Sequence, residues 1–70
     1  MQHDFPELKF FGQKVQARRF ALLMNTPHLS MLAGLPHAEV DQIERGLALP
    51  TLAGAAALAR ALEVPLRDLL

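Results

Sequence analysis

The side chains best suited to specific hydrogen bonding gather between residues 37 and 45, in the segment HAEVDQIER. Apolar Val40 and Ile43 stand three apart there, which predicts a short helix with one buried stripe. The exposed positions of this helix are His37, Ala38, Glu39, Asp41 and Gln42. The amide of Gln42 both donates and accepts, whereas the carboxylates only accept. We therefore expect this helix to present a face for recognition by hydrogen bonds.

The sequence contains no comparable set of residues for catalysis or for metal binding. His37 and Asp41 stand four apart and could share one metal on a helix face, but no third ligand stands close to them in the sequence. No nucleophile beside a base, no paired catalytic carboxylates and no Gly-rich phosphate loop can be assembled. The chain also has no Cys, so it has no disulfides and no thiolate ligands. We expect neither an enzyme nor a bound metal or cofactor.

Arg19 stands where an unpaired cation is least expected, on the apolar stripe of a predicted first helix. That stripe consists of Leu8, Phe11 or Gly12, Val15, Arg19 and Leu22. A buried guanidinium needs a carboxylate in bidentate geometry, because an unpaired buried charge costs several kcal/mol. Glu44, near the end of the helix 37–45, is the natural partner. The alternative is that Arg19 extends to water and Glu44 is a surface charge.

Caps, breakers and apolar spacing predict five helices. They cover approximately residues 5–24, 27–33, 37–45, 51–62 and 66–70. Asp4 and Glu7 have the spacing of a capping box at the start of the first helix. Asn25 and Thr51 are expected to cap the second and fourth helices. The chain 1–70 is thus expected to form a single all-α domain, a compact bundle of five helices.

Residues 29–46, LSMLAGLPHAEVDQIERG, predict two short amphipathic helices joined by a turn. The first helix carries its apolar stripe at Leu29, Leu32 and Ala33. Gly34 follows, and glycine enters a left-handed turn without steric cost. Two helices that cross over a turn of this length form a helix-turn-helix, whose second helix can enter a DNA major groove.

From Phe11 to Leu70 the chain resembles the Cro/repressor-type (XRE-like) helix-turn-helix family. The segments that carry the resemblance are FFGQKVQARR, LSMLAG, VDQIERG and TLAGAAALARALEVPLRDLL. The resemblance implies a bundle of the lambda-repressor-like DNA-binding type with a central helix-turn-helix. It implies a pair between Arg19 and Glu44, because phage repressors of this family join an Arg and a Glu at the matching places. The expected function is that of a sequence-specific DNA-binding transcriptional regulator, a dimeric repressor bound to double-stranded DNA.

The resemblance also implies which residues contact DNA. The base contacts are His37, Ala38, Glu39, Asp41 and Gln42, and the phosphate contacts are Lys14, Arg18, Thr26 and Arg45. Gln42 is the best candidate because a Gln amide can pair with both N6 and N7 of adenine. Pro36 departs from the family, which usually has a Ser or Thr cap there, so no side-chain oxygen caps the recognition helix. The alternative for these positions is an ordinary solvated surface, and for Thr26 it is a plain capping residue.

The charge balance favours a different function. Seven Lys and Arg residues balance seven Asp and Glu, giving a net charge of zero, whereas a nucleic-acid binder usually has a strongly basic face. Glu39 and Asp41 add negative charge to the helix that should meet DNA. These observations motivate an alternative function, a protein-interaction module of the antitoxin or anti-repressor kind that keeps the fold without binding DNA.

The chain has more large apolar side chains than one small core can hide. They are Phe10, Phe20, Leu23, Leu47, Leu49, Leu66, Leu69 and Leu70. Exposed apolar patches usually mark an interface with a protein partner. Related proteins pair through the last helix, so we expect Leu66, Leu69 and Leu70 in a homodimer interface. The alternative is that the chain is a domain cut from a longer protein.

The sequence predicts no association with membranes. No apolar run approaches the roughly 20 residues that span a bilayer. The N-terminus MQHDFPEL lacks a basic segment followed by an apolar one, as a secretory signal would have. We therefore expect a cytoplasmic protein.

Overall fold

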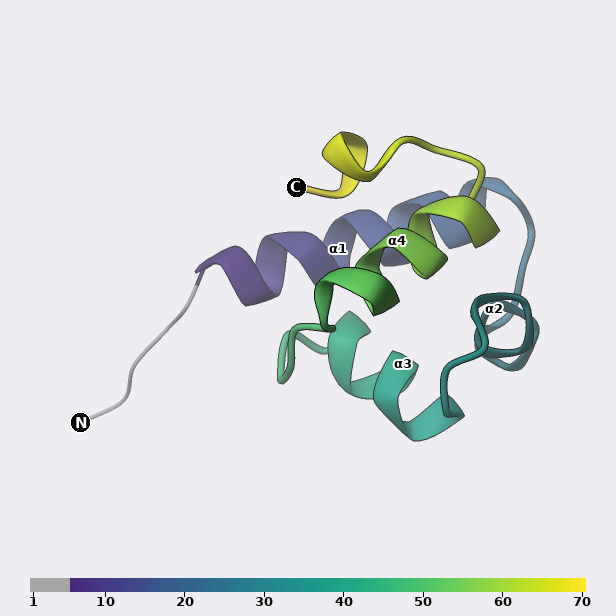
Figure 1. The fold of residues 1–70 in the computed structure, drawn as a ribbon, viewed down its shortest axis with the longest axis horizontal. Coiled ribbons are helices and arrows are strands. Elements are labelled where there is room, and N and C mark those ends of the chain that lie inside the picture. The colour runs from purple at the N-terminus through teal and green to yellow at the C-terminus, as the bar shows by residue number, and fades with distance from the viewer. Residues whose placement is uncertain (1–5) are drawn as a thin grey trace.

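The computed structural model describes residues 6–70, and the regular structure in that range is helical throughout (Figure 1). The elements are α1 (Pro6–Ala21), α2 (Thr26–Ala33), α3 (His37–Glu44), α4 (Leu52–Ala61) and the 3₁₀ turn η1 (Leu66–Leu69). Helix α1 packs against α3 and η1, while α2 packs against α3 and α4. Figure 1 shows η1 and α3 on opposite sides of α1. The all-α prediction is confirmed.

The predicted fifth α-helix is wrong. Residues Leu66–Leu69 form a 3₁₀ turn instead, with backbone bonds from Asp68 N to Pro65 O and from Leu70 N to Arg67 O. Four residues after a proline are too few to nucleate an α-helix, and a 3₁₀ turn is the usual form of so short a piece. Along residues 6–70, no helix is long and apolar enough to cross a bilayer.

Helix α1 ends three residues earlier than the predicted boundary at residue 24. The N–H of Met24 donates to the Arg19 carbonyl and that of Leu23 to the Phe20 carbonyl, at 3.0 Å each. This is the Schellman pattern of helix ends. Leu23 takes the left-handed position with φ 55°, where glycine is usual. No glycine or other local signal therefore marks this helix end in the sequence. The predicted capping box begins at Asp4, outside the described residues.

The other predicted helix signals are confirmed. Asn25 and Thr51 each accept a hydrogen bond from the backbone N–H three residues on, and so cap α2 and α4. Gly34 ends α2 in the left-handed conformation, with φ 70°. Pro36 precedes α3 without a side-chain cap. Asn25 thus fixes where α2 begins, and Gly34 fixes where it ends and the turn to α3 starts.

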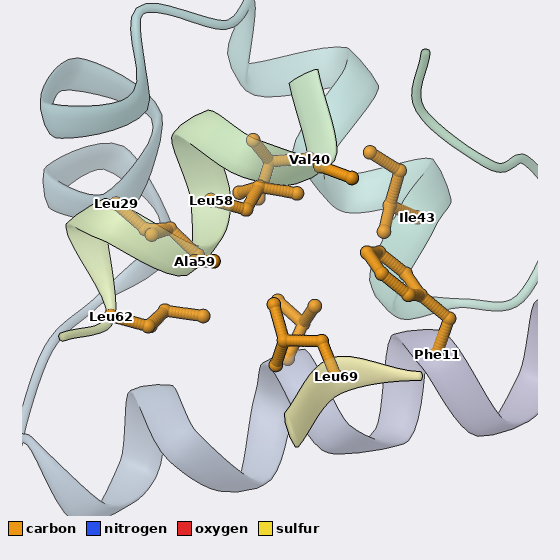
Figure 2. Packing of buried hydrophobic residues seen from close by; sticks show 10 residues of the cluster. Phe11, Leu29, Val40, Ile43, Leu58, Ala59, Leu62 and Leu69 are labelled. Carbon is orange, nitrogen blue, oxygen red and sulfur yellow. The ribbon is translucent and has the colours of Figure 1, made fainter. Parts of the chain in front are cut away.

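The core lies between the helices and consists of the side chains in Figure 2. Its buried apolar members are Phe11, Val15, Leu29, Val40, Ile43, Ala55, Leu58, Ala59, Leu62 and Leu69. Leu32, which was predicted to face the core, is half exposed. Ser30 is buried in its stead, and its hydroxyl donates to the Pro27 carbonyl at 2.9 Å. Helix α2 has only two turns and contacts both α3 and α4, so not every residue of its predicted apolar stripe is buried.

Gly12 sets the distance between α1 and α3. It is buried, and a Cβ at this position would collide with the backbone carbonyl oxygen of Ile43 and lie 3.1 Å from that of Glu44. Only glycine allows the backbones of the two helices to approach so closely. This contact holds the end of α3 against α1.

Candidate nucleic-acid interface

Helix α3 turns one face to the core and the other to solvent. Val40 and Ile43 are fully buried. His37, Ala38, Gln42 and Arg45 are exposed, while Glu39 and Asp41 are half exposed. Figure 1 shows α3 at the edge of the molecule away from η1. The residues that the sequence assigned to base contacts therefore lie on an open surface.

The ion pair that the sequence predicted between Arg19 and Glu44 is present. The guanidinium donates from Nε to Oε2 at 2.7 Å and from Nη2 to Oε1 at 2.8 Å, which is bidentate geometry. Its Nη1 donates to the Met24 carbonyl at 2.9 Å. The two side chains are only 9% and 6% exposed. The alternative of a solvated Arg19 is therefore excluded.

This pair joins the end of α1 to the end of α3. Its hydrogen bond with Glu44 raises the pKa of Arg19 above the ordinary arginine value, although burial acts in the opposite direction. The Phe20 ring lies 4.7 Å from the guanidinium carbon and covers it with an aromatic face. Because the Glu44 carboxylate is paired and buried, it does not add negative charge to the exposed face of α3.

The start of α3 meets the start of α2. Thr26 Oγ1 and His37 Nε2 lie 2.8 Å apart and share a hydrogen bond. A predicted phosphate contact and a predicted base contact are thus brought together. The first N–H groups of a helix have no partner within the helix and favour anions. Two helix starts placed side by side next to exposed polar side chains suit a phosphate backbone that runs past them.

Arg45, one residue beyond α3, pairs with Asp41 one turn earlier. Their Nε and Oδ2 atoms lie 3.3 Å apart, and the two side chains are 68% and 48% exposed. The exposed Gln42 side chain makes no hydrogen bond to the described part of the chain. Its amide is therefore free to donate and accept hydrogen bonds on the exposed face of α3.

Lys14 and Arg18 do not lie on this face, so the structure does not bring them together with the other predicted phosphate contacts. Lys14 Nζ donates to the Leu70 carbonyl at 2.8 Å, and Arg18 Nε donates to the Leu62 carbonyl at 2.9 Å. Both side chains line a hollow beside η1. Helical spacing places them on one edge of α1, whereas Gly12 and Arg19 occupy the edge that contacts α3. Charge and helix number alone could not distinguish the two edges.

Lys9 is a cation that the sequence did not single out for contact with DNA. A Cβ at Gly46 would lie 3.2 Å from Lys9 Cα, so the first half of α1 runs directly beside the residue that follows Arg45. Gly46 has φ 76°, a left-handed turn that permits this approach. The contact between Lys9 and Gly46 is a tertiary one between residues far apart in the sequence, so no local sequence signal predicts it.

The predicted dimer residues differ in their burial. Leu69 is 1% exposed and belongs to the core, Leu66 is half buried against that core, and Leu70 is 71% exposed. Leu69 is therefore wrong as a surface residue, because the 3₁₀ turn directs it inward. A hollow of about 240 Å³ remains next to it. It is lined by Glu7, Phe10, Phe11, Leu49, Leu69 and Leu70.

The exposed apolar residues around that hollow, Phe10, Leu49 and Leu70, form what we call the apolar patch. Their exposed fractions are 55%, 53% and 71%. Within residues 6–70 no group of three or more His, Asp or Glu side chains could hold a metal ion. The exposed face of α3 and the apolar patch are thus two surfaces of the described chain that a partner could contact.

The fold and this exposed face define an XRE/Cro-type helix-turn-helix protein, and the chain belongs to that family. It is similar to the restriction-modification controller protein C.AhdI from Aeromonas hydrophila, whose crystal structure it matches with a TM-score of 0.90 and 32% sequence identity. The match covers 94% of this chain and 100% of that chain. The sequence matches no protein-family model and no curated protein.

Proposed function

We propose that this protein is a sequence-specific DNA-binding transcriptional regulator that places α3 in the major groove. The observation that carries the proposal is the open face of α3, with the Gln42 amide unpaired among the described residues and the opposite face locked into the core. Membership in the XRE/Cro-type family supports it. The likeness to a restriction-modification controller favours a regulator of restriction-modification genes. Such a protein acts in the cytoplasm, on double-stranded DNA.

The structure suggests how the contacts divide. His37, Ala38 and Gln42 would read base edges, with Gln42 bidentate to adenine. The flanking carboxylates of Glu39 and Asp41 could accept from the amino group of cytosine. At the two ends of this face, Thr26, Arg45 and Lys9 would contact phosphates, which set register and orientation but carry no sequence information.

We further propose that the protein acts as a homodimer through the apolar patch. Chains of this size bury only about 60% of their unfolded surface, so an apolar contact with a second copy would add to a small core. A two-fold dimer can place its two recognition helices about 34 Å apart, one turn of DNA. Repression of a promoter that contains two such half-sites is the regulatory outcome that we propose.

The test is a selection of bound duplexes from a random pool, followed by a salt titration of the selected duplex. We expect enrichment of a two-fold-symmetric sequence. We also expect log affinity to fall linearly with log salt, with a slope set by the number of phosphates contacted. No binding to any duplex at low salt would overturn the proposal.

The second candidate is a protein-interaction module of the antitoxin or anti-repressor kind. It is favoured by Glu39 and Asp41 on the exposed face, which suit a basic protein surface better than a polyanion. It predicts no binding to duplex DNA at low salt, together with binding to a basic partner that is lost when both carboxylates become amides. The salt titration therefore separates the two functions.

A further inference from the structure

Positive charge is scarce in the helix-turn-helix. Between Arg19 and Arg60 the sequence contains a single Lys or Arg, and that residue is Arg45. Contacts between cations and phosphates supply most of the sequence-independent affinity for DNA. In this protein the helix-turn-helix has one permanent cation for that purpose.

That single cation is already engaged within the protein. Arg45 Nε lies 3.3 Å from Asp41 Oδ2, on a face where both side chains remain exposed. An exposed i,i+4 ion pair on a helix shifts an equilibrium by only about twofold. The pair therefore holds Arg45 weakly, and a DNA phosphate can compete for it.

We propose that Asp41 is a specificity-determining residue that acts through Arg45. On a sequence with no donor opposite Asp41, moving Arg45 to a phosphate leaves the carboxylate unpaired beside an anionic backbone, which is unfavourable. Where the amino group of cytosine or adenine lies opposite, it donates to Asp41, and Arg45 is released at no loss of pairing. The carboxylate thus weakens binding to sequences that place guanine or thymine at this position and spares those that place cytosine or adenine there. This inference rests on the proposed function.

The test uses Asp41→Asn, which keeps the size of the side chain and removes its charge. Its binding is compared with wild type on a mixed-sequence duplex and on the duplex selected by the wild-type protein. We expect mixed-sequence affinity to rise about twofold or more, with the salt slope steeper by about 0.9, the value of one added phosphate contact. Affinity for the selected duplex does not rise, so the ratio of the two affinities falls.

Two further variants separate this mechanism from simple loss of negative charge. Glu39→Gln removes a carboxylate from the same helix without touching Arg45, and it should leave the salt slope on the mixed-sequence duplex unchanged. In an Arg45→Gln background, Asp41→Asn should raise the affinity for the mixed-sequence duplex no more than Glu39→Gln does. The reason is that a coupling between two residues disappears when one of them is absent. All variants should keep a melting temperature within a few degrees of wild type, since the residues are on the surface and their ion pair is weak.

Two results would overturn the inference while DNA binding itself stands. One is an Asp41→Asn effect of the same size in the Arg45→Gln background. The other is an equal rise in affinity for both duplexes. Failure of the wild-type protein to bind either duplex at low salt is a different outcome, because it refutes the proposed function and takes this inference with it.

Discussion

At the scale of single residues, the Arg19–Glu44 pair carries the sharpest consequence for stability. Both side chains are nearly inaccessible to water and satisfy each other in bidentate geometry. Moving the two charges out of water carries a desolvation penalty, which their mutual attraction offsets. If one partner is removed, the other charge keeps its desolvation penalty and loses the attraction.

Arg19→Ala should therefore lower the free energy of unfolding by about 3–5 kcal/mol, measured by urea denaturation. Arg60→Ala, at an exposed position in the last turn of α4, is the matched control and should change it by less than about 0.5 kcal/mol. The double replacement Arg19→Met with Glu44→Leu should recover most of the loss, since no charge then stays buried. Equal losses in the single and double variants would contradict this account.

The pH dependence of that loss follows from the pKa of Arg19, which its hydrogen bond with Glu44 raises. A raised pKa in the folded state means that the arginine's contribution is complete below its unfolded value. It disappears only as the pH rises through the higher folded value. We expect the difference between wild type and Arg19→Ala to stay constant from about pH 6 to pH 9. A loss of the difference in that range would show that the arginine gives up its proton there.

Gln42 is the residue on which base recognition depends. Gln42→Ala should relax the preference at one or two base pairs and cost about 1–3 kcal/mol on the selected duplex, measured by competition binding. The matched control is Gln13→Ala, at an exposed position of α1, which should leave both values unchanged. Equal weakening on every sequence would show that Gln42 contacts the backbone and not the bases.

At the scale of elements, two glycines hold α3 in place for different physical reasons. A side chain on Gly12 would meet the backbone of α3, which cannot give way locally. A side chain on Gly34 would meet nothing within 4 Å, but its φ of 70° is unfavourable for any residue with a Cβ.

Gly12→Ala should accordingly destabilise the fold more than Gly34→Ala, by about 3 kcal/mol against about 1 kcal/mol. Thermal unfolding followed by circular dichroism measures both. Each variant adds the same methyl group, so each is the control for the other. The reverse order would mean that α1 and α3 can separate more easily than their packing indicates.

Helices α1 and α4 end with non-glycine residues in the left-handed conformation, Leu23 at φ 55° and Glu63 at φ 61°. Leu23 is 95% exposed, so its side chain contributes little to packing. Leu23→Gly and Glu63→Gly should each raise the free energy of unfolding by up to about 1 kcal/mol, because relief of backbone strain exceeds the added freedom of the unfolded chain. Ala17→Gly, inside α1, should instead lower it by about 1 kcal/mol. A loss at both left-handed positions would argue against strain there.

At the scale of the whole molecule, the proposed dimer depends on the apolar patch. Leu49→Asp should give a monomer by sedimentation, with the helical content of wild type, because a desolvated carboxylate in an apolar interface is strongly unfavourable. Affinity for the selected two-fold-symmetric duplex should fall far more than affinity for a single half-site. Leu23→Asp places the same charge on a remote exposed leucine and should leave assembly intact. An unchanged mass for Leu49→Asp would place the interface elsewhere.

The sequence by itself determined the features that depend on short-range interactions. Asn25 and Gly34 fix the two ends of α2, and Thr51 fixes the start of α4, through interactions within a few residues. The second to fourth helices were predicted to within one residue at each end. The Arg19–Glu44 pair was predictable for another reason. A cation on an apolar stripe needs a carboxylate partner, and Glu44 stands at the position where related repressors have the paired Glu.

The tertiary structure alone decided which surfaces meet. Whether a side chain on α1 faces α3 or η1 depends on how the helices dock, and this placed Lys14 and Arg18 away from α3 and Lys9 beside Gly46. Docking also buried Leu69 and exposed Leu32. Periodicity identifies an apolar stripe but not its exact edges, because the cost of exposing one leucine is small compared with the gain from packing whole helices together.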